Sequence, residues 1–267
     1  MIRREPQVAG QFYSCSRDKL ESDVRGFLKE TPKDDAIAIV SPHAGYIYSG
    51  DVAGSVFSEA RIPENVILIG PNHTGLGAKV SIMTAGEWET PLGRVSINSE
   101  LAERLVSAST FFTIDSDAHL REHSLEVQLP FITELSPTTS IVPITVMQAS
   151  FETCEELGKA IATVIKGYDE EVLIVVSSDM NHYESDEVTQ KKDKLAIDKV
   201  LALDPEGLLS ITREKNITMC GAVPTAIALV AARELGATGA RLVDYATSAA
   251  VSGDSSHVVG YAGMIIE

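Results

Sequence analysis

Short apolar runs alternate along the chain with segments in which apolar residues recur at helical spacing. The runs with the length of buried strands are residues 36–40, 65–69, 140–146 and 171–177. Helical spacing marks residues 19–30, 151–166 and 224–235. The last helix is expected to begin at Pro224 and to stop at Gly236, because proline and glycine commonly bound helices. This alternation predicts an α/β fold.

Two further apolar segments, residues 241–247 and 257–266, lie near the end of the chain. Gly253-Asp254-Ser255-Ser256 stands between them, and such a sequence is typical of a turn. We expect these segments to be a closing pair of strands. No repeat, low-complexity tract or flexible linker interrupts the sequence, so we expect one domain over residues 1–267, a usual length for an α/β domain.

Composition and charge narrow the classes of partner. Apolar residues make up 44% of the chain and charged residues 22%, which supplies a core and argues against disorder. Acidic residues outnumber basic ones 38 to 22, for a formal net charge of −16. Such a field repels phosphate backbones and anionic lipids, so we expect no nucleic-acid partner and no membrane association.

The sequence also favours a cytoplasmic location. No apolar run approaches the roughly 20 residues of a membrane span. The residues after Arg3 and Arg4 lack the apolar stretch of a signal peptide. Cys15, Cys154 and Cys220 form no CxxC pair, and their odd number argues against a disulfide framework. We therefore expect reduced cysteines.

Three of the six histidines follow directly on predicted buried strands. These are His43, His73 and His182. Because ligands bind at the carboxyl ends of strands in open α/β sheets, we expect the three loops to converge on one crevice. Each histidine taken singly is more often a surface or hydrogen-bonding residue. Their equivalent positions favour a shared site, and imidazole is a good ligand for iron, copper, zinc and nickel.

Cys220 is a candidate third ligand. It lies just before the helix predicted from Pro224, and a thiol near a helix N-terminus tends toward the thiolate, whether as ligand or as nucleophile. The alternative is that Cys220 is a small buried apolar residue, as most free cysteines are. Cys154, on the apolar face of its own helix, fits that alternative well.

Two further residues are candidates for the same crevice. His123 lies in Arg121-Glu122-His123-Ser124-Leu125-Glu126, where it could contact a substrate or support a ligand, or belong to simple helix capping. Asp179 precedes His182 by three residues. It is expected either to orient the His182 imidazole or to cap the segment that follows.

With these residues assembled, the chain resembles the MEMO family (mediator of cell motility), also called AmmeMemoRadiSam system B proteins. The matching pieces run in order from about residue 5 to the end of the chain. They are Ala9-Gly10-Gln11-Phe12-Tyr13, Pro42-His43-Ala44-Gly45-Tyr46, Gly70-Pro71-Asn72-His73, Glu122-His123-Ser124-Leu125-Glu126, Ser177-Ser178-Asp179 with His182, Cys220-Gly221 and Asp244-Tyr245-Ala246-Thr247-Ser248.

The resemblance implies a fold and a set of roles. Such proteins are similar to class III extradiol dioxygenases, so we expect a single α/β domain with a mixed, mostly parallel central sheet and helices on both faces. His43, His73 and Cys220 would be the metal ligands, and His182 would be an acid/base group with Asp179 and His123 beside it. The dioxygenases use two histidines and a carboxylate. A thiolate in the third position argues against carrying over ring cleavage.

Three functions remain open on the sequence. The leading hypothesis is a redox protein or oxidoreductase that binds one iron or copper ion and no nucleotide cofactor, with a small molecule or peptide in the crevice. The second is a non-enzymatic module that binds a peptide or anion there, since helix N-termini attract anions without a metal. The third is a hydrolase with Cys220 as nucleophile and His182 as base.

Overall fold

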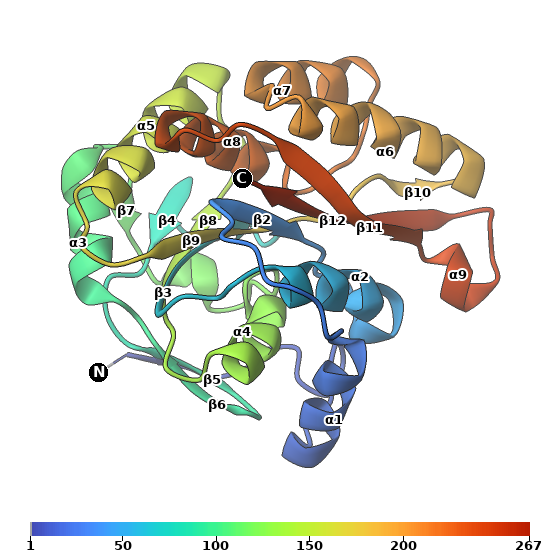
Figure 1. The fold of residues 1–267 in the computed structure, drawn as a ribbon, viewed down its shortest axis with the longest axis horizontal. Coiled ribbons are helices and arrows are strands. Elements are labelled where there is room, and N and C mark those ends of the chain that lie inside the picture. The colour runs from blue at the N-terminus through green and yellow to red at the C-terminus, as the bar shows by residue number, and fades with distance from the viewer. Residues whose placement is uncertain (1) are drawn as a thin grey trace.

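The computed structural model describes residues 2–267, which form one large mixed sheet covered by helices (Figure 1). The strands follow the order β10-β12-β2-β9-β3-β8-β4-β7, and β11 pairs with the other side of β12. In that order their bounds are His182–Glu184, Val258–Ile266, Ala38–Ser41, Val172–Ser177, Asn65–Pro71, Ser140–Val146, Val80–Ile82 and Thr113–Ile114, with Ala240–Thr247 for β11.

The centre of this sheet is parallel. Strands β2, β9, β3 and β8 pair in parallel, while β12 and β4 join them antiparallel on either side. Every residue of β2 and β3 is buried, as expected where helices cover both faces of a parallel sheet. Burial on both faces explains the continuous apolar runs in the sequence. Because the four strands are parallel, their carboxyl ends meet at one edge of the sheet.

Successive side chains of the central strands point into two separate cores. Val40 and Ile67 contribute to one core, and Ile39 and Leu68 to the other. Figure 1 shows a helical layer on each side of the sheet. The first core is covered by α3 (Ser99–Ala108), α5 (Phe151–Lys166), α6 (Asp186–Leu201), α7 (Pro205–Glu214) and α8 (Ala222–Leu235). The second is covered by α1 (Arg17–Phe27), α2 (Tyr46–Glu59) and α4 (Leu129–Leu135).

The remaining elements are short. A small sheet of order β1-β5-β6 brings the beginning of the chain against a hairpin. Its strands are Arg3–Arg4, Glu87–Thr90 and Gly93–Ser96. Two single-turn 3-10 helices, η1 (Asp117–His119) and η2 (Glu126–Gln128), flank a loop that contributes to the site below.

The fold class predicted from the sequence is confirmed, with small shifts in the bounds. The strand at 140–146 and the helix at 151–166 have the predicted bounds, and the helix predicted from Pro224 begins two residues earlier, at Ala222. The closing pair of strands is present as β11 and β12, but the short helix α9 (Ala249–Ser252) precedes the turn. None of the helices in residues 2–267 is long and apolar enough to cross a membrane.

Candidate metal site

Three histidines from separate loops meet beyond the carboxyl ends of the parallel strands. His43 follows β2, His73 follows β3, and His123 lies between η1 and η2. One ring nitrogen from each lies within 4.8 Å of those of the other two, so the group could hold a metal ion. His43 is buried, His123 half-buried and His73 the most exposed. The cluster therefore opens toward solvent on the His73 side.

The hydrogen bonds of His43 determine which ring nitrogen faces the cluster. Its Nδ1 lies 2.8 Å from the Ser177 hydroxyl. That hydroxyl donates its proton to the Ser124 carbonyl and accepts from the Gln128 amide, so it accepts from His43 Nδ1–H as well. Nε2 then carries the lone pair, which faces the Cys220 thiol at 3.4 Å. Burial, and next the neighbouring imidazoles, hold the pKa of His43 well below its usual value, which keeps it neutral as a ligand must be.

Glu122 likewise determines which ring nitrogen of His73 faces the cluster. Its carboxylate accepts from His73 Nδ1 at 2.9 Å and from the backbone N–H of His73, His123 and Ser124. Burial alone would raise the pKa of Glu122, but these hydrogen bonds and the charge of His73 lower it to about 2. A carboxylate on the second nitrogen of a histidine fixes its tautomer and raises its basicity as a metal ligand. Nε2 of His73 is then the nitrogen left for the cluster, where a metal ion would displace its proton.

His123 contacts both other histidines. Its ring stacks on His73 with centroids 4.8 Å apart and meets the edge of His43 at 5.5 Å. Phe12, from the N-terminal segment, packs on His123 at 4.8 Å. The sequence suggested that His123 faces the crevice, and the structure brings it there. Glu122, its neighbour in the chain, was not singled out as a site residue, because nothing in the sequence reveals which carboxylate a loop turns inward.

Cys220 lies beside the cluster, at the start of α8. Its sulfur is 3.4 Å from His43 Nε2 and accepts from the backbone N–H of Asp179 at 3.3 Å. Among the described residues, the group within 4.8 Å comprises the three histidines and does not include Cys220. Burial and the Asp179 charge raise the pKa of this thiol. Burial thus opposes the thiolate that the sequence suggested at this helix N-terminus, because the charged form loses its hydration.

His182 and Asp179 lie close enough for their charges to interact, but the hydrogen bonds of each go to other partners. Nδ1 of His182 lies 3.0 Å from the Thr218 carbonyl, and Thr218 is held in turn by the Asn181 side chain. The Asp179 carboxylate instead accepts from the backbone N–H of His43 at 2.7 Å. Nor does Asp179 cap the next helix, because the N-cap of α6 is Ser185. Thr218 and Asn181 carry no sequence signal for this role.

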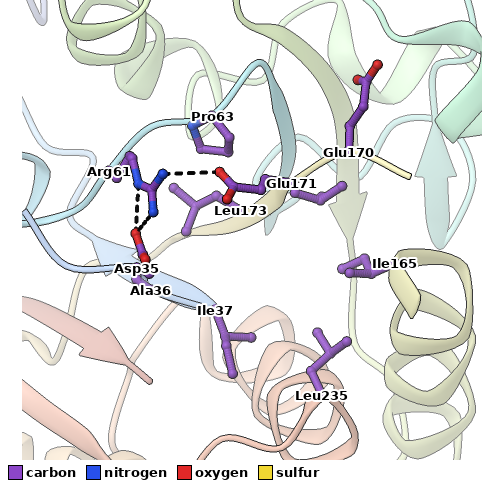
Figure 2. Close-up of a pocket in the computed structure, with 11 residues that line it drawn as sticks. Asp35, Ala36, Ile37, Arg61, Pro63, Ile165, Glu170, Glu171, Leu173 and Leu235 are labelled. Atoms are coloured by element: carbon purple, nitrogen blue, oxygen red, sulfur yellow. Dashed lines mark hydrogen bonds and ion pairs between the residues drawn. The ribbon is translucent and has the colours of Figure 1, made fainter. Parts of the chain in front are cut away.

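A hollow lies at the opposite, amino end of the strands (Figure 2). It has a volume of about 300 Å³ and an apolar floor that includes Ile37 and Leu235. At its rim Arg61 pairs with Asp35 and Glu171. The residues described as lining it include no histidine or cysteine. Because its single cation is already paired, this hollow offers no comparable chemistry.

Comparison with known proteins gives a consistent result over the whole length. The family model described as "Memo-like protein" matches residues 4–265. A MEMO1 family protein of Methanopyrus kandleri is 41% identical over 279 residues, covering 99% of each chain. A MEMO1 family protein of Aquifex aeolicus is 43% identical over 265 residues, covering 98% of each chain.

A solved structure supports the fold alone. An uncharacterized protein from Escherichia coli K12 superposes with a TM-score of 0.52 at 13% identity, covering 84% of this chain and 98% of that chain. At that identity the likeness concerns the arrangement of helices and strands and not the chemistry of the site.

Proposed function

The chain belongs to the Memo-like protein family, and from that premise we propose that it binds one redox-active metal ion, iron or copper, at the histidine cluster. The observation that supports this most is the convergence of His43, His73 and His123 from three loops, with ligand atoms within 4.8 Å. Imidazole nitrogen suits both metals, and a neighbouring thiol favours copper in its reduced state.

His43 and His73 are the proposed constant ligands. Each has its Nδ1 hydrogen-bonded to a buried oxygen, of Ser177 or Glu122, which leaves Nε2 as the nitrogen that would bind the ion. This is the usual arrangement of metal-bound histidine. The sequence proposes Cys220 as third ligand, and the geometry also offers His123. A thiolate at that position needs the metal charge to displace the thiol proton.

The other residues near the cluster are proposed to exchange protons, to orient His43 and to admit a ligand. A bound iron or copper ion would supply one-electron chemistry and a fixed positive charge. His182, held at Nδ1 by the Thr218 carbonyl, keeps Nε2 available to take or give a proton, and Asp179 fixes the backbone of His43. A small molecule or peptide would enter on the open side, where the His73 side chain is 34% exposed.

Metal content of protein purified without oxygen tests the proposal. We expect stoichiometric iron or copper in the wild type and its loss in His43→Ala. His257→Ala is the matched control, because His257 is exposed and its ring contacts Ser256. Wild type without either metal, or His43→Ala with unchanged content, would contradict the proposal.

Two variants identify the third ligand in Co²⁺-loaded protein. If Cys220 coordinates, the wild type shows thiolate-to-metal charge-transfer absorption, and Cys220→Ser abolishes it. If His123 coordinates, that absorption is absent and His123→Gln lowers the affinity for Co²⁺, while Cys220→Ser leaves it unchanged. Titration followed by absorption separates the two arrangements.

A further inference from the structure

We propose that Arg4, at the very beginning of the described chain, is a positioning residue for the histidine site. It fixes, from the side away from the cluster, the loop that carries Glu122 and His123. The inference rests on the proposed metal function, and it adds a residue with no metal-ligating chemistry of its own.

Arg4 is buried, with only 2% of its surface exposed. Its guanidinium donates from Nε to the His119 carbonyl at 2.6 Å and from Nη2 to the Glu122 carbonyl at 2.5 Å. Nη1 forms an ion pair with the Glu126 carboxylate at 2.7 Å. The guanidinium carbon Cζ lies over the Trp88 ring, 4.1 Å from its centroid. One side chain therefore contacts the loop at its start, its middle and its end.

Glu126, the acidic partner of Arg4, is also hydrogen-bonded to other residues of the N-terminal segment. Its carboxylate also accepts from the backbone N–H of Gln7 and Val8 and from the Tyr13 hydroxyl at 2.6 Å. Every hydrogen-bond donor to this buried carboxylate thus comes from residues 4–13, within the described part of the chain. The beginning of the chain and η2 are held together as one unit.

The loop needs such support because no strand places it. His43 and His73 follow strands of the central sheet, whereas His123 lies between two single-turn helices. On the cluster side, Ser124 donates to the Pro71 carbonyl. On the far side, the contacts come from Arg4. Residues 120–125 are therefore held between the sheet and the N-terminal segment.

The chemistry of arginine suits this role better than that of lysine. Its planar fork donates in several directions at once, while an ammonium is a single charge on a flexible stem. The charge of Arg4 also balances Glu126 in a buried setting, where an unpaired carboxylate is costly. Glu122 is then left to interact with His73. A shift of the Glu122 backbone would move the carboxylate that fixes the His73 tautomer.

Arg4→Lys tests the proposal, with Co²⁺ as the probe. The variant keeps the charge opposite Glu126 but loses the fork to the two carbonyls. We expect the affinity for Co²⁺ to fall about 10- to 100-fold, as for other residues that orient ligands, with a changed Co²⁺ absorption spectrum. Arg3→Lys is the matched control, because Arg3 is half-exposed and pairs with Glu87 and Glu89. Its affinity should equal that of the wild type.

A general loss of stability would lower the Co²⁺ affinity by the same factor whichever loop residues are present. The affinity of Arg4→Lys is therefore also measured in two variant backgrounds, Glu122→Gln and His123→Ala. If Arg4 acts through the loop, Arg4→Lys has a smaller effect on Co²⁺ affinity in Glu122→Gln or in His123→Ala than in the wild type. Equal effects in all backgrounds would overturn the proposal. So would Arg4→Lys with wild-type affinity and spectrum. A wild type that binds no Co²⁺ refutes the metal function itself, which is a different result.

Tyr13→Phe covers the case in which Arg4→Lys does not fold. It removes only the hydroxyl that donates to Glu126. We expect a smaller fall in Co²⁺ affinity, again reduced in one of the two backgrounds. An unchanged affinity in folded Tyr13→Phe together with an unfolded Arg4→Lys would assign Arg4 to stability alone.

Discussion

At the scale of single residues, the hydrogen-bond partners of a buried carboxyl group decide whether its pKa lies below or above the usual value. Glu122 is surrounded by donors, including the backbone of its own loop, and it stays ionised with a pKa of about 2. Asp193, behind the His182 loop, is equally buried but accepts only from the Asn181 backbone and the Tyr245 hydroxyl. Burial raises the pKa of Asp193 to about 7. The same carboxyl chemistry therefore gives a group that stays ionised in one place and a group that titrates near neutral pH in the other.

Asp193 predicts a pH dependence of stability. Its pKa is higher in the folded state than the usual 3.8, so the folded state binds more protons between these values and stability falls as pH rises. The contribution lost by pH 7 is on the order of a few kcal/mol. We expect urea unfolding at pH 5, 6 and 7 to show a steeper decline, or a smaller gain, for the wild type than for Asp193→Asn. Parallel pH profiles would contradict this assignment.

Site residues could be predicted from the sequence only where they occupy a regular position, directly after an apolar strand. His43 and His73 follow apolar strands, so the position of each was visible in the sequence. Glu122, Thr218 and Arg4 contribute through hydrogen bonds between segments far apart in the chain, as between Arg4 and Glu122. No local pattern encodes such contacts, because they depend on how the loops fold back.

At the scale of elements, helix α2 packs closely against α1 through small residues, which hide its helical pattern in the sequence. It was not predicted, since small residues such as Ser49, Gly50 and Ser55 occupy much of its buried surface and obscure the helical period. The strand β8 and helix α5 were predicted because each carries a continuous or periodic apolar pattern. Small residues let α1 approach α2, with the Phe27 ring against Gly50.

Gly54→Ala tests this close approach. A Cβ at position 54 would overlap the backbone carbonyl of Phe27, which cannot rotate away. We expect a loss of about 1–3 kcal/mol in the free energy of unfolding, despite the better helix propensity of alanine. Gly26→Ala in α1 is the control, because its Cβ would meet nothing within 4 Å. Urea unfolding that shows both variants equally stable would contradict the packing described here.

At the scale of the whole molecule, the proposed ligands come from distant parts of the chain, so the proposed metal binding would be coupled to folding. His43 and Cys220 are separated by 177 positions, yet their side chains touch. An unfolded chain cannot offer this arrangement, so an ion bound as proposed would stabilise the folded state by mass action. The net charge of −16 will also attract divalent cations nonspecifically, and an experiment must separate the two effects.

Thermal unfolding with and without metal makes the separation. At a free Co²⁺ concentration of about 100 times Kd we expect about 2.7 kcal/mol of stabilisation, which raises Tm by roughly 5–10 °C. A chelator should reverse the increase, and His43→Ala should not show it. Ca²⁺ prefers oxygen ligands and should give only the small effect of charge screening. An equal rise in Tm with Ca²⁺ and Co²⁺ would contradict a histidine site.

The contacts of Arg4 also bear on biosynthesis. Its partner Glu126 follows it by 122 positions, which at about 5–20 residues per second corresponds to roughly 6–24 seconds on the ribosome. Throughout that interval the guanidinium has no acidic partner from η2. The segment around Arg4 therefore stays without this buried partner until η2 has been made, and the loop between η1 and η2 becomes fixed only when the two segments, synthesised seconds apart, pack together.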